Sequence, residues 1–151
     1  MYKRILVGID DSQDAKDALD KALEISNEDG SEVIVFHSVV RDVTALMPAF
    51  SFAGPSNGVI SYLIRRDEAN QGATLLKDAE KLFADHGKKI ETRLIFDISP
   101  KDYINKISKE EKFDLVILGC KGKHSKIKRA ILGTTPTEVI NSAPSDVLIV
   151  R

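Results

Sequence analysis

The sequence has little of what marks several large classes of protein. It contains one cysteine, Cys120, so it cannot form a disulfide within the chain, and no metal-ligand spacing surrounds that thiol. No apolar run reaches the ~18 residues of a membrane-spanning helix, and the N-terminus enters an expected strand without a signal peptide. The net charge of −1 gives no reason to expect nucleic-acid binding. We therefore expect a cytoplasmic protein without membrane or nucleic-acid partners.

What is present is typical of a single globular unit. The chain has 151 residues, of which 42% are hydrophobic and 30% are charged. That length suits one domain and allows roughly two-thirds of the unfolded surface to be buried. We expect one domain over residues 1–151.

Short apolar runs alternate with helical patterns along the chain. We expect strands at 5–9, 33–37, 90–96, 115–118 and 147–150, and helices between Ser12 and Gly30, from about 62 to 86, from Pro100 onward and from about 136 to 141. Strict alternation predicts an α/β fold: one doubly wound, five-stranded parallel sheet with helices on both faces. If the first and fourth strands are neighbours, the strand order is 3-2-1-4-5.

Residues 42–62 interrupt this alternation. They combine Pro48, Gly54 and Pro55 with the aromatic residues Phe50 and Phe52 and carry little charge. A connection of this length is uncommon in a compact domain, and its apolar content argues against a solvated, disordered loop. Two interpretations stay open: a flap over a ligand or partner surface, or an insertion that packs on a core of its own.

Two glycine-containing segments near the C-terminus predict an anion site. The fourth strand ends at Gly119 and a second glycine follows at Gly122, while Gly133, Thr134 and Thr135 precede the last helix. Glycines let a backbone approach an anion closely, and a helix N-terminus supplies N–H donors. We interpret these segments as a phosphate cradle and therefore as a nucleotide site. A solvated, lysine-rich turn is the alternative interpretation.

Asp10 follows the first strand, whose end would lie beside the end of the fourth. In doubly wound sheets, ligands bind outside the carboxyl ends of the strands, at the point where the strand order reverses. We therefore expect a crevice between Asp10 and the glycine loop. The Asp10 carboxylate would accept hydrogen bonds from ribose hydroxyls there.

The residues around these motifs resemble the universal stress protein family. The resemblance is carried by residues 3–12 (KRILVGIDDS), 36–39 (FHSV), 113–119 (FDLVILG) and 143–151 (APSDVLIVR), and it extends over essentially the whole chain. It implies an adenine-nucleotide-binding regulatory protein of the stress response. The nucleotide would be ATP, or AMP or ADP, with Mg²⁺ carried by the phosphates when it is present.

The resemblance also implies which residues bind. The adenine would lie near Ile9 and the main chain of Ser38 and Val39, and the ribose near Asp10 and Gly119. The whole expected set is Gly8, Ile9, Asp10, Ser38, Val39, Leu118, Gly119, Gly122, His124, Ser125, Gly133, Thr134 and Thr135. We expect neither a catalytic residue nor a dedicated metal site.

The chain departs from the family pattern in three places. ATP-binding members carry Gly, two residues, Gly, nine residues, then Gly and Ser or Thr, whereas ten residues separate Gly122 from Gly133 here. A loop bulge absorbs the extra residue, or the phosphates are misplaced. In addition, Asp11 and Asp97 stand where the family commonly has glycine, which brings the two local turns into question.

Three functions remain open at this point. The first is the nucleotide-binding regulator. The second is an enzyme with at most weak ATP hydrolysis, since the chain has no Walker lysine pattern, nucleophile elbow or usable Ser-His-Asp set. The third is a protein-interaction module that has lost its nucleotide, which the ten-residue spacing favours.

The C-terminal strand and the histidines carry the remaining expectations. The strand from Val147 to Val150 is apolar and expected at a sheet edge, where family members commonly pair across a twofold axis, so we expect a homodimer with an unidentified protein partner. His37 is expected to be a hydrogen-bonded structural residue, and His86 to lie at the surface. His124 either touches a phosphate or is solvated.

Overall fold

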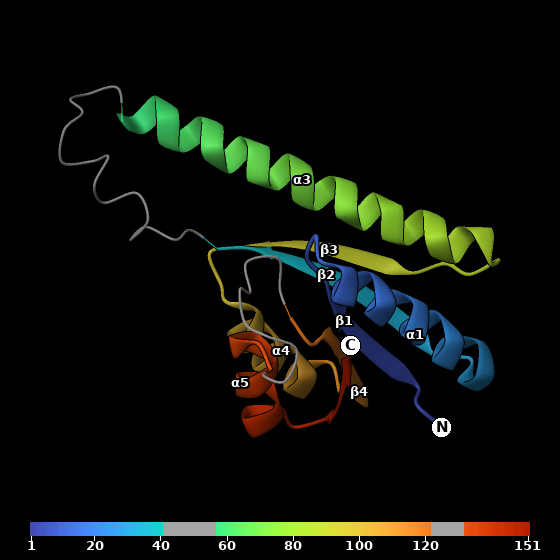
Figure 1. The fold of residues 1–151 in the computed structure, drawn as a ribbon. Coiled ribbons are helices and arrows are strands. Elements are labelled where there is room, and N and C mark those ends of the chain that lie inside the picture. Colours follow the sequence, from blue (N-terminus) through green and yellow to red (C-terminus); the bar gives the residue numbers. More distant parts are fainter. Residues whose placement is uncertain (41–56, 122–131) are drawn as a thin grey trace.

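The computed structural model describes residues 1–40, 57–121 and 132–151 of the chain. In chain order its elements are β1 (Arg4–Gly8), α1 (Gln13–Asp29), β2 (Glu32–Val39), α3 (Asn57–Asp85), β3 (Glu91–Phe96), α4 (Pro100–Glu110), β4 (Leu115–Gly119), α5 (Thr134–Ser142) and β5 (Asp146–Val150). The strands are all parallel and lie in the order β3-β2-β1-β4-β5 (Figure 1). The predicted α/β fold is therefore confirmed, including its strand order.

Helices α1 and α4 begin where their local chemistry predicts. The Ser12 hydroxyl accepts the N–H of Ala15 at 3.1 Å, which satisfies a donor that has no partner within α1. Ser99 caps α4 in the same way, and Pro100 is the first residue of that helix. Gly30 ends α1 with a φ of 68°, a conformation that glycine adopts without a steric clash.

Helix α3 is longer than predicted, and the expected loop over 42–62 is wrong at its C-terminal end. The helix begins at Asn57 instead of near residue 62. Asn57 and Gly58 are typical of turns, but a helical glycine costs only about 1 kcal/mol relative to alanine. Extending an existing helix avoids the unfavourable nucleation step, so a 29-residue helix accommodates both residues. The remainder of the expected loop, up to residue 56, lies outside the described residues.

Helix α5 begins at Thr134, two residues before the predicted start at Pro136. Proline is favoured at the first helical position, which was the basis of the prediction. Here it is the third residue of the helix, where its missing N–H is still one of the four that have no partner within a helix. Gly133 is the N-cap, with an extended backbone (φ −62°, ψ 166°).

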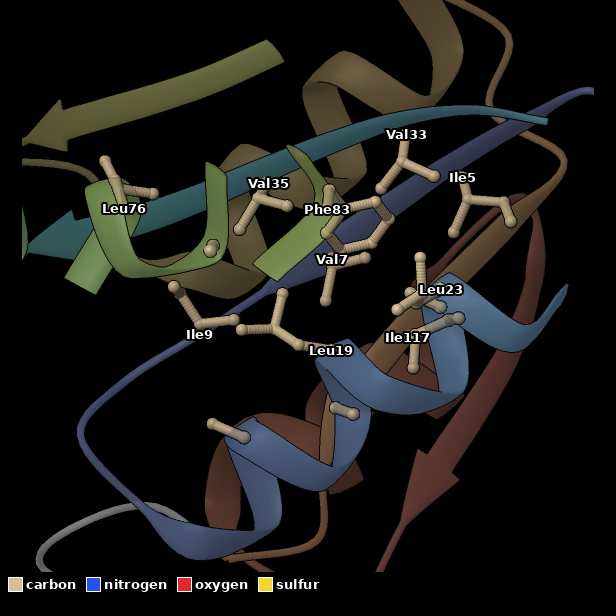
Figure 2. Packing of buried hydrophobic residues seen from close by; sticks show 14 of the residues in the cluster. Ile5, Val7, Ile9, Leu19, Leu23, Val33, Val35, Leu76, Phe83 and Ile117 are labelled. Atoms are coloured by element: carbon tan, nitrogen blue, oxygen red, sulfur yellow. The ribbon is translucent and has the colours of Figure 1, made fainter. Parts of the chain in front are cut away.

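The hydrophobic core lies on both faces of the sheet. On one face, α1 and α3 pack against alternate strand residues such as Val7, Val35 and Ile117, with the ring of Phe83 buried among them (Figure 2). On the other face, α4 and α5 pack against the residues between, around Phe36. Strands with apolar residues on both faces are typical of parallel sheets covered by helices on both sides. Within the described ranges, no helix combines the length and apolar composition that crossing a membrane requires.

Candidate functional site

The carboxyl ends of β1 and β4 open into a cavity of about 930 Å³. The strand order reverses here, because the chain continues from β1 to β2 on one side while β4 lies on the other. The cavity is lined by ten of the thirteen predicted binding residues: Gly8, Ile9, Asp10, Ser38, Val39, Leu118, Gly119, Gly133, Thr134 and Thr135. The other three, Gly122, His124 and Ser125, lie outside the described residues.

Asp10 closes the end of β1 and starts the turn into α1. Its Oδ1 accepts the backbone N–H of Ser12 at 3.1 Å, and Ser12 in turn caps α1. An aspartate that binds the N–H two residues ahead forms a local turn that replaces the strand ladder. This turn places the Asp10 carboxylate at the cavity, where it can accept hydrogen bonds from a bound hydroxyl group.

Packing against α1 requires a glycine at position 119, whereas the sequence suggested that this glycine lets the backbone approach a bound anion. A Cβ at this position would lie 2.7 Å from the carbonyl carbon of Asp14 and 2.8 Å from the nitrogen of Ala15, so a side chain would collide with the backbone of α1. Gly119 is not among the described glycines with positive φ. The Asp14 carboxylate also accepts the N–H of Lys121 at 3.0 Å. The glycine therefore brings the first turn of α1 against the end of β4.

Gly8 has a similar explanation. A Cβ there would lie 2.7 Å from Leu118 Cδ2 and 3.0 Å from Phe36 Cζ. The space above Gly8 is taken by these two core side chains on the α4 and α5 face. Gly8 lines the cavity, but its lack of a side chain is explained by the core.

The N-terminus of α5 presents backbone donors to the cavity. Its N-cap, Gly133, has no side chain that could accept from the first N–H groups of the helix. The backbone of Gly133 is fixed, because its N–H donates to the Cys120 carbonyl at 2.9 Å and its carbonyl accepts from the Thr137 hydroxyl at 2.9 Å. Thr134 and Thr135 follow directly and line the cavity. This arrangement suits an anion, since the helix dipole is positive at this end.

The end of β2 forms the opposite side of the cavity. The Nδ1–H of His37 donates to the Ile9 carbonyl at 2.8 Å, which agrees with the predicted structural role of this histidine, although His37 also lines the cavity. The carbonyl of Val39 accepts the N–H of Asp97 at 3.1 Å, and the Ser38 hydroxyl donates to the Ile98 carbonyl. The turn after β3 therefore fixes the β2 backbone that lines the site.

Sequence reasoning missed the wall that α3 contributes. Five residues of this helix line the cavity at helical spacing: Ile64, Asp67, Glu68, Gln71 and Leu75. The signal in the sequence was a face of the helix that is apolar in its C-terminal half and polar in its N-terminal half. These residues fall within the predicted helix, but nothing in that segment indicates that the helix passes over the ends of the strands.

This combination defines a class: doubly wound α/β proteins with a ligand cavity at the point where the strand order reverses. The chain belongs to the universal stress protein family, whose sequence pattern matches residues 1–151. Universal stress protein MJ0531 of Methanocaldococcus jannaschii is 30% identical to it over 155 residues, covering 100% of this chain and 83% of the relative.

Solved structures show the same fold. UspA of Lactobacillus plantarum matches with a TM-score of 0.82 at 23% identity, covering 99% of this chain and 98% of that one. The universal stress protein of Archaeoglobus fulgidus, solved in complex with dAMP, matches with a TM-score of 0.68 at 20% identity and covers 99% and 98% of the two chains.

Proposed function

We propose that this protein is a cytosolic regulator of the universal stress type that binds an adenine nucleotide in the cavity at the ends of β1 and β4. The observation that carries the proposal is that two complementary groups meet there. The Asp10 carboxylate is an acceptor for ribose hydroxyls, and the N-terminus of α5 is a donor for phosphate oxygens.

Related proteins support the choice of nucleotide. The Archaeoglobus fulgidus protein holds dAMP, and two further universal stress proteins, 23% and 17% identical to this chain, were solved with cAMP and AMP. All three ligands share adenine and a phosphate. We propose that this chain binds AMP, ADP or ATP at the equivalent cavity.

We further propose that Mg²⁺ enters the site on the phosphates of a triphosphate. In proteins, Mg²⁺ is commonly bound by one or two carboxylates together with the phosphates of the substrate. In the part of the chain that the structure describes, no three His, Cys, Asp or Glu side chains are grouped to hold a metal ion. The dependence of ATP affinity on Mg²⁺ tests this point.

The protein's assembly is the last part of the proposal. β5 is an edge strand next to β4, as predicted from its position at the end of the alternation. An apolar edge strand invites pairing with another chain. We propose a homodimer formed along the strand from Val147 to Val150.

The first experiment identifies the ligand. Freshly purified protein is denatured, and the released nucleotides are identified by mass. Folded protein freed of nucleotide is then titrated calorimetrically with AMP, ADP and ATP, with and without Mg²⁺. Bound adenine nucleotide or saturable binding supports the proposal. Protein that contains no nucleotide and binds none of the three would contradict the proposal. The interaction module would then be the better explanation.

A matched pair of variants locates the phosphate. Thr134→Pro removes one backbone N–H at the first helical position, which proline favours, and the extended Gly133 before it is compatible with proline. Thr134→Ala removes the hydroxyl and keeps the N–H. Losing a hydrogen bond to a charged group costs roughly 1.5–3 kcal/mol, so we expect Thr134→Pro to raise the ATP dissociation constant at least tenfold and Thr134→Ala to raise it less. Equal ATP dissociation constants for the two variants would mean that the backbone N–H of residue 134 does not bind the phosphates.

A further inference from the structure

The hydrogen-bond ladder between β1 and β2 ends at the cavity, before its next bond. In this ladder the even-numbered residues of β2 direct their backbone groups to β1. The N–H of Glu32 donates to Lys3 at 2.9 Å, and the carbonyl of Phe36 accepts from Ile9 at 3.0 Å. The next bond would join the N–H of Ser38 to the carbonyl of Ile9. Within the described residues this bond is not formed, although Ser38 still belongs to β2 and pairs with β3.

The side chain of His37 takes the place of that bond. Its Nδ1–H donates to the Ile9 carbonyl at 2.8 Å, so it satisfies the acceptor that the Ser38 N–H would otherwise reach. Ile9 is only 7% exposed, and a buried carbonyl requires a hydrogen-bond donor. Because His37 supplies this donor, the Ser38 N–H remains directed at the cavity that Ser38 lines.

Helix α3 fixes the position of the His37 ring. A Cβ at Gly72 would lie 2.6 Å from His37 Cδ2 and 3.3 Å from His37 Nε2, so the ring fits beneath the helix because this residue has no side chain. A glycine within a helix costs about 1 kcal/mol relative to alanine. The place of Gly72 in α3 is thus explained by the ring, which the helix holds where Nδ1 reaches Ile9.

The carbonyl that His37 fixes directly precedes Asp10. The Asp10 carboxylate accepts the N–H of Ser12 and lines the cavity. If the ladder continued by one bond, the chain after Ile9 would follow β2 further before it turned into α1. Asp10 would then enter the turn from a different position. The hydrogen bond from His37 therefore affects both the β2 backbone and the carboxylate at the cavity.

We propose that His37 is a positioning residue, which ends the β1–β2 ladder and leaves the Ser38 N–H as a donor for an acceptor atom of the bound nucleotide. This inference rests on the proposed nucleotide-binding function. Without the imidazole, the Ile9 carbonyl would take the Ser38 N–H, and the cavity would lose that donor.

A matched pair of variants tests the role of the imidazole. Asparagine and leucine have nearly the same shape, but only asparagine can donate, and its Nδ2 stands where Nδ1 stands in histidine. His37→Leu should raise the AMP dissociation constant about fivefold through the lost hydrogen bond, whereas His37→Asn should stay within about twofold of wild type. Urea unfolding should rank the pair in the opposite order, because leucine suits a half-buried position better than asparagine. A merely structural role would instead give the weaker binding in the less stable variant.

Amide hydrogen exchange measured by NMR tests the ladder without any ligand. In wild-type protein freed of nucleotide, the N–H of Ser38 should exchange about tenfold or more faster than that of Phe36, which lies within the ladder. The Ser38 N–H should become protected in His37→Leu, because it then donates to Ile9. It should stay unprotected in His37→Asn.

The outcomes separate this inference from the function beneath it. Equal AMP dissociation constants for the two variants, or a Ser38 N–H as protected as that of Phe36 in wild-type protein, overturn the role of His37 and leave nucleotide binding in place. A wild-type protein that binds no AMP overturns the proposed function and, with it, the donor role of Ser38. The exchange rates then still show whether His37 ends the ladder.

Discussion

Arg65 of α3 forms an ion pair with Asp97 at the end of β3, with Arg65 Nη2 lying 2.8 Å from Asp97 Oδ2. The guanidinium carbon also lies 5.5 Å from the centre of the Phe96 ring. The N–H of Asp97 donates to Val39, and its side chain reaches the helix that forms the cavity wall. One turn therefore connects the ends of β2 and β3 with the part of α3 that lines the cavity.

Asp97 performs this role with a φ of 60°, in the left-handed region. The resemblance described above implies a glycine after this strand, and aspartate is one of the few other residues that adopts the conformation at modest cost. Asp97 in place of glycine thus keeps the conformation of the turn and adds a carboxylate that pairs with Arg65.

Substitutions at Asp97 separate backbone conformation from the ion pair. Asp97→Gly keeps the φ value and loses an ion pair worth about 0–1 kcal/mol at this exposure, so its unfolding free energy should stay within about 1 kcal/mol of wild type. Asp97→Ala loses the ion pair and places alanine in the left-handed region, which should destabilise it by roughly 1–2 kcal/mol. Urea unfolding measures both. Equal stability of the two variants would mean that the turn relaxes and the conformation is not required.

Glu111 connects two arginines at the amino end of the sheet. Its carboxylate accepts from Arg93 Nη1 and Nη2 at 2.8 and 3.0 Å, and from Arg4 Nη2 at 3.3 Å. The hydrogen bonds from Arg93 are the largest cause that holds the pKa of Glu111 below its usual value, and Arg4 adds to the effect. This carboxylate therefore stabilises the fold more when it is ionised.

The sign of the resulting pH dependence follows from the lowered pKa. A carboxyl group whose pKa is lower in the folded protein contributes fully above its unfolded pKa, about 4.3 for glutamate, and loses that contribution as the pH falls through its folded pKa. Glu111→Gln should be destabilised by about 1–2 kcal/mol at pH 7, and the difference from wild type should shrink as the pH falls from 5 to 3. Chemical unfolding at a series of pH values measures this, and a difference that stays constant would contradict the role of the charge.

The sequence predicts the sheet because its strands are short apolar runs buried on both faces and its helices have explicit start and stop residues, such as Ser12, Gly30 and Pro100. It also predicts which strand ends meet, because the strand order follows from the alternation together with the special residues after β1 and β4. The apolar runs and the helix start and stop residues are local features of the sequence, and the strand order depends only on how the elements follow one another.

What the sequence did not reveal depends on packing between distant elements. Gly119 looked like a ligand-contacting glycine, but the backbone of α1 is what excludes a side chain there. The residues with which α3 lines the cavity fall within the predicted helix, but their position beside the strand ends depends on how that helix packs on the sheet. Neither a close approach of two backbones nor the packing of a helix on a sheet leaves a pattern within a single segment.

The proposed dimer can be tested with the hydrogen-bonding pattern of β5. The N–H of Asp146 donates to Asp114 at 3.1 Å, and the carbonyl of Val150 accepts from Cys120 at 2.7 Å. Successive residues of a strand direct their backbone groups to opposite sides, so the backbone groups of Val147 are directed to the open edge. Proline is tolerated in an edge strand when the missing N–H faces outward.

Val147→Pro should therefore abolish pairing between two β5 strands while keeping the ladder to β4. Val147→Ala removes much of the same side chain and keeps the N–H, so it should remain a dimer, with a loss of stability of about 1 kcal/mol. Analytical ultracentrifugation at micromolar concentration distinguishes these states. A wild-type monomer would contradict the dimer itself, whereas a Val147→Pro variant that stays folded and dimeric would place the interface elsewhere on the molecule.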